Sequence, residues 1–441
     1  MDPTSKANFH LSLVATSRND NHGGSLTQRM QHFVDGFVEQ CRRHNLSAEL
    51  IMVEWNPPAD RPPLAEALRW PEDTGPCEIR IITVPRELHA RLEHADQLPL
   101  FQMIAKNVGI RRARGKFVLA TNIDILFSDE SVSYMRERLK TGRVYRADRY
   151  DVPAAVPQTP VFEEILEFCR RDAFRIHANG FTYLREGGRW NPLIRIKAHM
   201  DPRMRYLTFW LPRRIFQRDA WANVFRELTH FRQNMQFEGG VQHGGFVRKA
   251  GRFIARLAGG SARLWQRIWG GIRHRIIDPW LFTNACGDFT LLSRDDWFKL
   301  RGYPEWAMYS FHIDSMLLHQ AYFHGIREIY MGRRPAIYHI DHDAGSGYTP
   351  EAADKLFARL EAKGIPCLDW MRDVMPIIRE MEVTRRKGAV PMYNAENWGY
   401  GDIDLPDQII RPAGGGRPGR AVSDLPDASA ATDQELAAKS L

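Results

Sequence analysis

The chain has 441 residues, of which 44% are hydrophobic and 26% are charged, an ordinary composition for a globular protein with about two domains. Its formal net charge of +8 favours anionic partners such as nucleotides, phospholipid headgroups or nucleic acid, without choosing among them. These values exclude a disordered or fibrous chain.

No apolar run approaches the roughly 18 residues that a membrane-spanning helix needs, and the N-terminus lacks the basic flank and apolar stretch of a secretion signal. The five cysteines are scattered and form no CxxC pair, so neither a disulfide framework nor a zinc site is indicated. We therefore expect a cytoplasmic protein with reduced thiols.

The first 150 residues alternate between apolar runs and helical periodicity. The pattern predicts strands at 11–16, 48–55, 78–84 and 116–124, and helices at 26–43 and 101–115, the second ending at Gly115. This order is typical of an α/β protein with a mostly parallel central sheet flanked by helices. Ligands of such proteins bind at the carboxyl ends of the strands.

Two further helices are indicated in the second half of the chain. A short strand ends at Ser293, whose hydroxyl is a good cap for the following helix, with Asp296 three residues on. Asp314 begins an amphipathic helix, for which we expect Met316, Leu317, Ala321 and Tyr322 to face inward. A third helix is predicted at 351–362.

Asn122 and Asp124 interrupt the apolar run FVLATNIDILF at residues 117–127. At the carboxyl end of a central strand, a metal ion or hydrogen bonds can offset the cost of burying a carboxylate. Alternatively, Asp124 caps the next helix, although Ser128 and Asp129 are better placed for that role.

Polar residues also follow the first two predicted strands. Thr16, Arg18 and Asn19 lie in a loop near a helix start, where side-chain and backbone donors can bind a diphosphate. The alternative is a solvated turn. Glu54 ends the second strand, where its carboxylate either accepts hydrogen bonds from a nucleoside or is an ordinary strand-end charge.

The segment AIYHIDHDAGSGY, at 336–348, places imidazole and carboxylate groups behind a short apolar run. Such groups can complete a transition-metal site. His339 and His342 are three residues apart, so on a strand they would face opposite sides. We therefore predict His339 as a ligand and leave His342 unassigned.

Residues 239–277 contain no Asp or Glu, and 245–277 combine many arginines with apolar residues at helical spacing. This pattern favours basic amphipathic helices that bind an anionic membrane surface. Alternatively, the apolar stripe packs on the protein and the arginines are solvated. A nucleic-acid-binding module would not explain Asp124, Asp314 and His339, so no nucleic-acid partner is expected.

Four segments resemble GT-A glycosyltransferases, particularly those of family 2: LVATSRND, AKNVGIRRARGKFVLATNID, GDFTLLSRDDWFKLRGYPEW and HIDSMLLHQAYFHG. The resemblance covers roughly residues 9–150 and 280–345. In that family a DxD motif ends the fourth strand and holds a divalent cation that bridges the diphosphate of a nucleotide sugar. Here the motif has Asn122 in place of its first aspartate and retains Asp124 as the usual metal ligand.

The resemblance also implies roles for other residues. Lys106 and Asn107 match a pair near the nucleotide, and Gly287 and Asp288 belong to a segment that lines the acceptor side and contacts the donor sugar. Asp314 matches the catalytic base, although an acid at a helix start is also stabilised by the helix dipole alone.

On this basis Asp124 and His339 would hold Mn²⁺ or Mg²⁺. The expected domains are a nucleotide-sugar-binding half at 1–150, a helical insertion at 151–279 with its basic segment 245–277, and an acceptor and catalytic part at 280–345. A helical extension at 346–411 and a disordered tail at 412–441 would follow.

The expected activity is inverting transfer of a sugar from a nucleotide-diphosphate sugar to a hydroxyl of a glycan or lipid-linked acceptor. It would serve cell-envelope or polysaccharide synthesis in the cytoplasm or at the inner face of the cytoplasmic membrane. The alternatives are a noncatalytic membrane-docking relative and a nucleotidyltransferase. The latter would need a glycine-rich loop directly after the first strand, whereas Gly23 and Gly24 come later.

Overall fold

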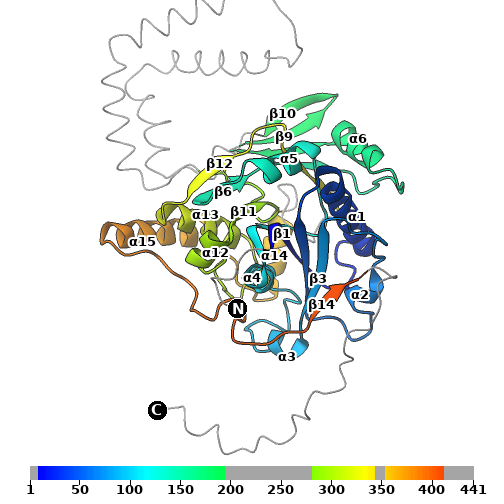
Figure 1. Cartoon of the computed structure of the whole chain (residues 1–441). Coiled ribbons are helices and arrows are strands. Elements are labelled where there is room, and N and C mark those ends of the chain that lie inside the picture. The colour runs from blue at the N-terminus through cyan, green and yellow to red at the C-terminus, as the bar shows by residue number, and fades with distance from the viewer. Residues whose placement is uncertain (1–7, 180, 194–280, 343–352, 412–441) are drawn as a thin grey trace, which may run out of the picture.

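The computed structural model describes residues 8–179, 181–193, 281–342 and 353–411, which form an α/β protein with two mixed sheets and covering helices (Figure 1). The larger sheet has the strand order β12 (Arg327–Tyr330), β6 (Arg143–Arg146), β11 (Thr290–Ser293), β4 (Gly115–Ala120), β1 (Phe9–Ser17), β2 (Ala48–Trp55), β3 (Cys77–Val84) and β14 (Asp407–Ile410). The smaller sheet has the order β10 (Arg189–Leu193), β9 (Phe181–Glu186), β8 (Arg175–Ala178), β7 (Asp148–Val152), β13 (Ala336–Ile340) and β5 (Ile125–Phe127).

The centre of the larger sheet is parallel. Leu13 of β1 lies opposite Leu50 of β2 and Leu119 of β4, and β2 continues in parallel to β3. However, β11 is antiparallel to β4 and β6, and β14 is antiparallel to β3. The α/β class is confirmed, but the expectation of a mostly parallel sheet is wrong, because an apolar run shows that a strand is buried without showing its direction.

Both faces of this sheet are covered, so its central strands are buried on two sides. Leu11, Leu13 and Ala15 face the core beneath α1 (Leu26–His44) and α5 (Asp129–Glu137). Val14 faces the opposite core, which α4 (Gln102–Arg112), α12 (Arg294–Leu300) and α13 (Ile313–Phe323) share. A Cβ at Gly109 of α4 would lie 2.5 Å from the Val14 side chain, so this glycine allows close helix packing.

Most local predictions in these regions are confirmed, with two corrections. The hydroxyl of Ser293 accepts a hydrogen bond from the backbone N of Asp296 at 3.2 Å, as its capping role predicts. Gly115 is not a helix stop but the first residue of β4, packed so tightly that a Cβ would lie 2.6 Å from the backbone N of Ser12. Tyr322 is 41% exposed and does not face inward as expected.

The run from 117 to 127 is two strands. β4 ends at Ala120 in the larger sheet, residues 121–124 connect, and β5 pairs with β13 in the smaller sheet. The polar residues therefore lie where the chain passes from one sheet to the other. The described part of the expected helical insertion contains α6 (Phe162–Asp172) together with β8, β9 and β10, so it is not wholly helical.

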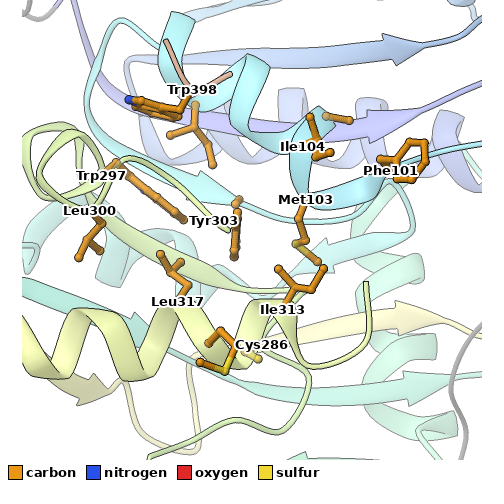
Figure 2. Close-up of a cluster of buried hydrophobic side chains, with 14 of the residues drawn as sticks. Phe101, Met103, Ile104, Cys286, Trp297, Leu300, Tyr303, Ile313, Leu317 and Trp398 are labelled. Atoms are coloured by element: carbon orange, nitrogen blue, oxygen red, sulfur yellow. The ribbon is translucent and has the colours of Figure 1, made fainter. Parts of the chain in front are cut away.

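After residue 352 the chain forms α14 (Ala353–Ala362), the π-helix η2 (Trp370–Val374) and α15 (Met375–Arg386), then returns to the larger sheet as β14. Figure 2 shows Trp398 of the returning segment in one apolar cluster with Met103, Trp297 and Ile313. The short helices α2 (Leu64–Ala67) and α3 (Arg86–His89) lie in loops after β2 and β3.

The basic segment 245–277 and the tail 412–441 lie outside the described residues, so their predicted membrane contact and disorder stay predictions. Within the described ranges, no helix combines the length and the apolar character needed to cross a bilayer.

Candidate functional site

A cavity of about 1670 Å³ opens at the carboxyl ends of β1 and β4. It is also lined by the smaller sheet, by loops around 283–288 and 306–312, and by the helices after residue 352. The residues predicted from the sequence that line it are Thr16, Arg18, Asn122, Asp124, Gly287, Asp288, Asp314 and His339. Residues from both halves of the chain therefore meet in one cavity.

Asp124, His339 and His342 form a candidate metal site, because one ligand atom from each lies within 4.8 Å of the others. The Oδ2 atom of Asp124 is 3.8 Å from Nε2 of His339 and 3.5 Å from Nε2 of His342. His342 was left unassigned on the basis of strand alternation. β13 ends at Ile340, so that alternation does not extend to His342.

The donor set fits a divalent metal. One carboxylate and two imidazoles suit a first-row transition ion better than Mg²⁺, which prefers oxygen ligands. The Oδ1 atom of Asp124 is buried and has no hydrogen-bond partner among the described residues, so it retains bonding capacity. The Nη1 atom of Arg29 lies 2.9 Å from Oδ2 and partly balances this charge.

Arg29 was not identified from the sequence. It belongs to α1 and is only 4% exposed, and its guanidinium also donates to the backbone oxygens of His22 and Gly24. The available signal was its position on the otherwise apolar face of the predicted helix, beside Met30. The structure therefore adds a fixed cation beside Asp124.

The two histidines differ in their electrostatic surroundings. Burial lowers the pKa of His342 to about 4, which leaves its imidazole neutral and able to bind a metal near neutral pH. Burial and Arg149 also act to lower the pKa of His339. Asp124 and Asp151 outweigh them, so the net shift of the His339 pKa is upward.

Asp151 forms an ion pair with His339 from the neighbouring strand. The register places Asp151 of β7 opposite His339 of β13 on one side and Arg175 of β8 on the other. Its Oδ1 atom lies 3.3 Å from Nδ1 of His339, and its Oδ2 atom accepts hydrogen bonds from Arg175 at 3.1 Å and His177 at 3.2 Å. A carboxylate behind a ligating histidine is a common way to fix the orientation of the ring.

The ionisation of Asp151 is set by its neighbours. Burial acts to raise its pKa, but the charge of Arg149 and the hydrogen bond from His177 hold the pKa well below its usual range. The sequence analysis missed this group. Its signal was the spacing of two between Arg149 and Asp151, and between Arg175 and His177, which puts each pair on one face of a strand.

The amide of Asn122 bridges a cation and an anion. Its Oδ1 atom accepts from Nζ of Lys106 at 2.8 Å, while its Nδ2 atom donates to the carboxylate of Asp288. An aspartate at this position would face Asp288 with a second negative charge. Burial acts to raise the pKa of Asp288, but Arg149 and His339 lower it overall. The amide therefore suits this site where a carboxylate would not.

Asp314 enters the cavity from the first turn of α13. The neighbouring Ile313 is held in the apolar cluster of Figure 2, and burying such a side chain stabilises the fold by about 1.5–3 kcal/mol. A Cβ at Gly287 would lie 3.0 Å from Oδ2 of Asp314, so the glycine leaves room for the carboxylate. Burial raises the pKa of Asp314, which strengthens it as a base.

The remaining predicted residues lie behind the cavity wall. Nδ2 of Asn19 donates to the backbone O of Pro62 at 2.9 Å, and Oε1 of Glu54 accepts from the backbone N of Leu64 at 2.8 Å. Burial raises the pKa of Glu54. These two side chains hold the loop after β2, contrary to their predicted place in a nucleotide crevice.

Lys106 and Asn107, which both belong to α4, likewise form hydrogen bonds with other protein groups around the cavity. Lys106 is fully buried and donates to the backbone O of Gly287 at 2.6 Å as well as to Asn122. Asn107 donates to the backbone O of Tyr303 at 2.8 Å and to Glu305 at 3.0 Å, and accepts from the backbone N of Tyr303 at 2.8 Å. Their polar atoms face protein groups instead of the cavity.

No protein-family model matches this chain, and a search of curated proteins found no match. The argument for function therefore rests on the motifs and on the geometry of the cavity, where a candidate metal site and the carboxylate of Asp314 occur together.

Proposed function

We propose that this protein is a glycosyltransferase of the GT-A type, which moves a sugar from a nucleotide-diphosphate sugar to an acceptor hydroxyl with inversion. The observation that carries the proposal is the placement of Asp124, His339 and His342 in one cavity with Asp314. The position of Asp124 after β4, at the carboxyl end of the parallel strands, supports a donor site there.

The donor would bind at the polar end of the cavity. A divalent ion held by Asp124, His339 and His342, best Mn²⁺, would supply charge neutralisation for the leaving diphosphate. Thr16 and Arg18 would contact the nucleotide from the loop after β1. Oγ1 of Thr16 is buried without a hydrogen-bond partner among the described residues, which is consistent with a polar ligand beside it.

The acceptor would bind beside Asp314. In the proposed step its carboxylate takes the proton of the acceptor hydroxyl as that oxygen forms a bond to the anomeric carbon. The bond between that carbon and the diphosphate oxygen breaks on the opposite face, which inverts the configuration. A raised pKa suits this role, because a general base works best when its pKa approaches the operating pH.

The test is calorimetric titration with UDP, GDP and dTDP, each with and without Mn²⁺, on the wild type, Asp124→Ala and Asp129→Ala. We expect one nucleotide to bind in a Mn²⁺-dependent manner. Asp124→Ala should weaken this binding by at least about 100-fold, on the order of 3 kcal/mol. The matched control Asp129→Ala should not, because Asp129 begins α5 and pairs with His44 outside the cavity.

Failure of all three nucleotides to bind would overturn the proposal and favour the noncatalytic alternative. Binding that needs no Mn²⁺ and is insensitive to Asp124→Ala would contradict the metal site.

A further inference from the structure

The cavity is larger than one small ligand requires. Pockets for single small molecules usually measure about 300–1000 Å³, whereas this one measures about 1670 Å³. The candidate metal site involves only three of the lining residues. Another part of the lining belongs to the loop at 306–312 and to the segment containing α14, η2 and α15, and the metal site does not explain it.

This second part of the lining, which we call the apolar end, includes Tyr309, Phe311, Leu360, Ile365, Trp370 and Ile377. Two of its acidic side chains are already engaged, whereas Glu361 also lines the cavity and its carboxylate has no such bond among the described residues. Asp369 accepts from the backbone N of Met371 at 2.9 Å and of Arg372 at 2.7 Å, and so caps η2. Asp373 accepts from Arg372 at 3.1 Å and from the backbone N of Asp369 at 2.8 Å.

Ser310 is engaged as well, since its hydroxyl donates to Oε1 of Gln102 at 3.1 Å. A free saccharide would require hydrogen-bonding groups at the apolar end to replace its water contacts. Because these side chains already form hydrogen bonds within the protein, the lining suits a hydrocarbon better than a sugar ring.

The apolar end adjoins the candidate base. Phe311 and His312 directly precede α13, where Asp314 lies. The ring centroids of Phe311 and Phe357 are 5.5 Å apart, and those of His312 and Trp370 are 5.3 Å apart. Aromatic contacts therefore connect α14 and η2 to the turn that carries Asp314.

The same end reaches the surface through apolar side chains. Phe357 of α14 is 36% exposed, and Met371, next to Trp370 in η2, is 37% exposed. A chain longer than the cavity could continue past these residues, since an apolar rim lowers the cost of its exit.

We propose that the apolar end binds the hydrocarbon chain of an amphiphilic acceptor, whose hydroxyl lies at Asp314. Naming this ligand the acceptor rests on the proposed function. The apolar site itself rests on the cavity volume, its lining and the exposed apolar residues beside it.

The experiment measures calorimetric binding of dodecyl β-glucoside, below its critical micelle concentration, and of methyl β-glucoside, which has the same head without the chain. The variants are Phe357→Ser and Val383→Ser. Val383 is a matched control, because it is an apolar residue of α15 that is 48% exposed and does not line the cavity.

We expect the dodecyl compound to bind the wild type at least about 100-fold more tightly than the methyl compound, because burying its chain is favourable. Phe357→Ser should weaken dodecyl binding by about tenfold, and Val383→Ser should leave it unchanged. Equal binding of the two glucosides, or equal effects of the two substitutions, would overturn the inference. Both sites are partly exposed, so both variants should fold, which their melting temperatures would show.

Titration of the same preparations with nucleotides and Mn²⁺ separates the two proposals. If no nucleotide binds but dodecyl binding still depends on Phe357, the proposed function fails and the apolar site stands. If Mn²⁺-dependent nucleotide binding is present and the dodecyl chain makes no difference, only the inference about the acceptor is overturned.

Discussion

Two regions of the molecule carry buried polar residues that differ in their hydrogen bonding. One is the cavity edge of the larger sheet, and the other is helix α4 behind it. At the cavity edge, Oδ1 of Asp124 is buried with no hydrogen-bond partner among the described residues. Behind it, the side chain of Asn107 makes three hydrogen bonds to residues 303 and 305. Both residues are buried, and both belong to the segment AKNVGIRRARGKFVLATNID, which resembles the GT-A family. Unused bonding capacity in a cavity distinguishes a candidate ligand from a framework residue.

The comparison predicts two classes of variant. Substitutions at the cavity edge should reduce ligand binding, whereas substitutions behind it should reduce stability and leave binding intact. The Asp124→Ala titration tests the first class.

Among the substitutions behind the cavity edge, the largest effect on stability is expected for Asn107→Ala. Removing the amide leaves the backbone N of Tyr303 without its buried acceptor, whereas the backbone O of Tyr303 keeps its bond from Asn394 and Glu305 keeps its bond from the backbone N of Gly399. The free energy of unfolding should therefore fall by about 2 kcal/mol. Urea unfolding measures this change. Any metal-dependent nucleotide binding should keep its wild-type affinity under conditions where the variant is folded.

Asn19→Ala is the matched control, because Asn19 is also a buried asparagine behind the cavity wall and its side chain donates one hydrogen bond, to Pro62. It should cost only about 1 kcal/mol. A large loss of nucleotide affinity in the Asn107 variant would break the distinction between the two layers.

Asp151→Asn tests whether a residue of the smaller sheet affects metal binding through its contact with His339. Asp151 is not a proposed metal ligand but forms an ion pair with His339, which is one, so Mn²⁺ affinity should fall by roughly 10- to 100-fold. Calorimetric titration with Mn²⁺ alone gives the measurement. Asp148→Asn on the same strand should retain wild-type affinity, because Asp148 bonds to Tyr330 away from the metal site. Equal losses in both variants would indicate general disruption of β7 and not positioning of His339.

Lys106→Met should change the pH dependence of stability. Burial lowers the pKa of Lys106 to about 8 in the folded protein, below the 10.5 of the free side chain. Between these values the unfolded chain binds more protons than the folded chain, so this lysine makes stability rise with pH. From pH 7 to pH 9 the wild type should gain about 1 kcal/mol relative to the variant, measured by urea unfolding. A difference that stays constant over this range would contradict the lowered pKa.

Local sequence patterns correctly predicted many of the helices and strands in the first half of the chain. The run AELIMVEW matches β2 from end to end, and the predicted helix at 26–43 matches α1 within one residue. These elements are encoded by burial periodicity within a few turns of chain. The same pattern placed Asp124 at the end of a strand, whereas the structure places it in the connection between β4 and β5, where it belongs to the candidate metal site.

Other parts of the site could not be obtained in this way. His342 joins Asp124 only because the chain turns after Ile340, and Asp151 meets His339 only because β7 pairs with β13. Glu54 was placed in the crevice because it is a carboxylate at a strand end, and Asn107 because its segment resembles a family. Neither observation reveals which partner a side chain has. Their hydrogen bonds connect segments that are distant along the chain or lie beyond a loop.

By itself, the sequence determined the α/β class, most of the local elements and the residue types that can bind a diphosphate and a metal. The tertiary structure alone decided the mixed direction of the strands, the division of the run at 117–127 between two sheets, and the grouping of Asp124 with two histidines. The physical reason is the separation along the chain over which each kind of interaction acts. Periodicity and capping act over a few residues, whereas strand pairing and the meeting of buried charges depend on contacts between segments more than a hundred residues apart.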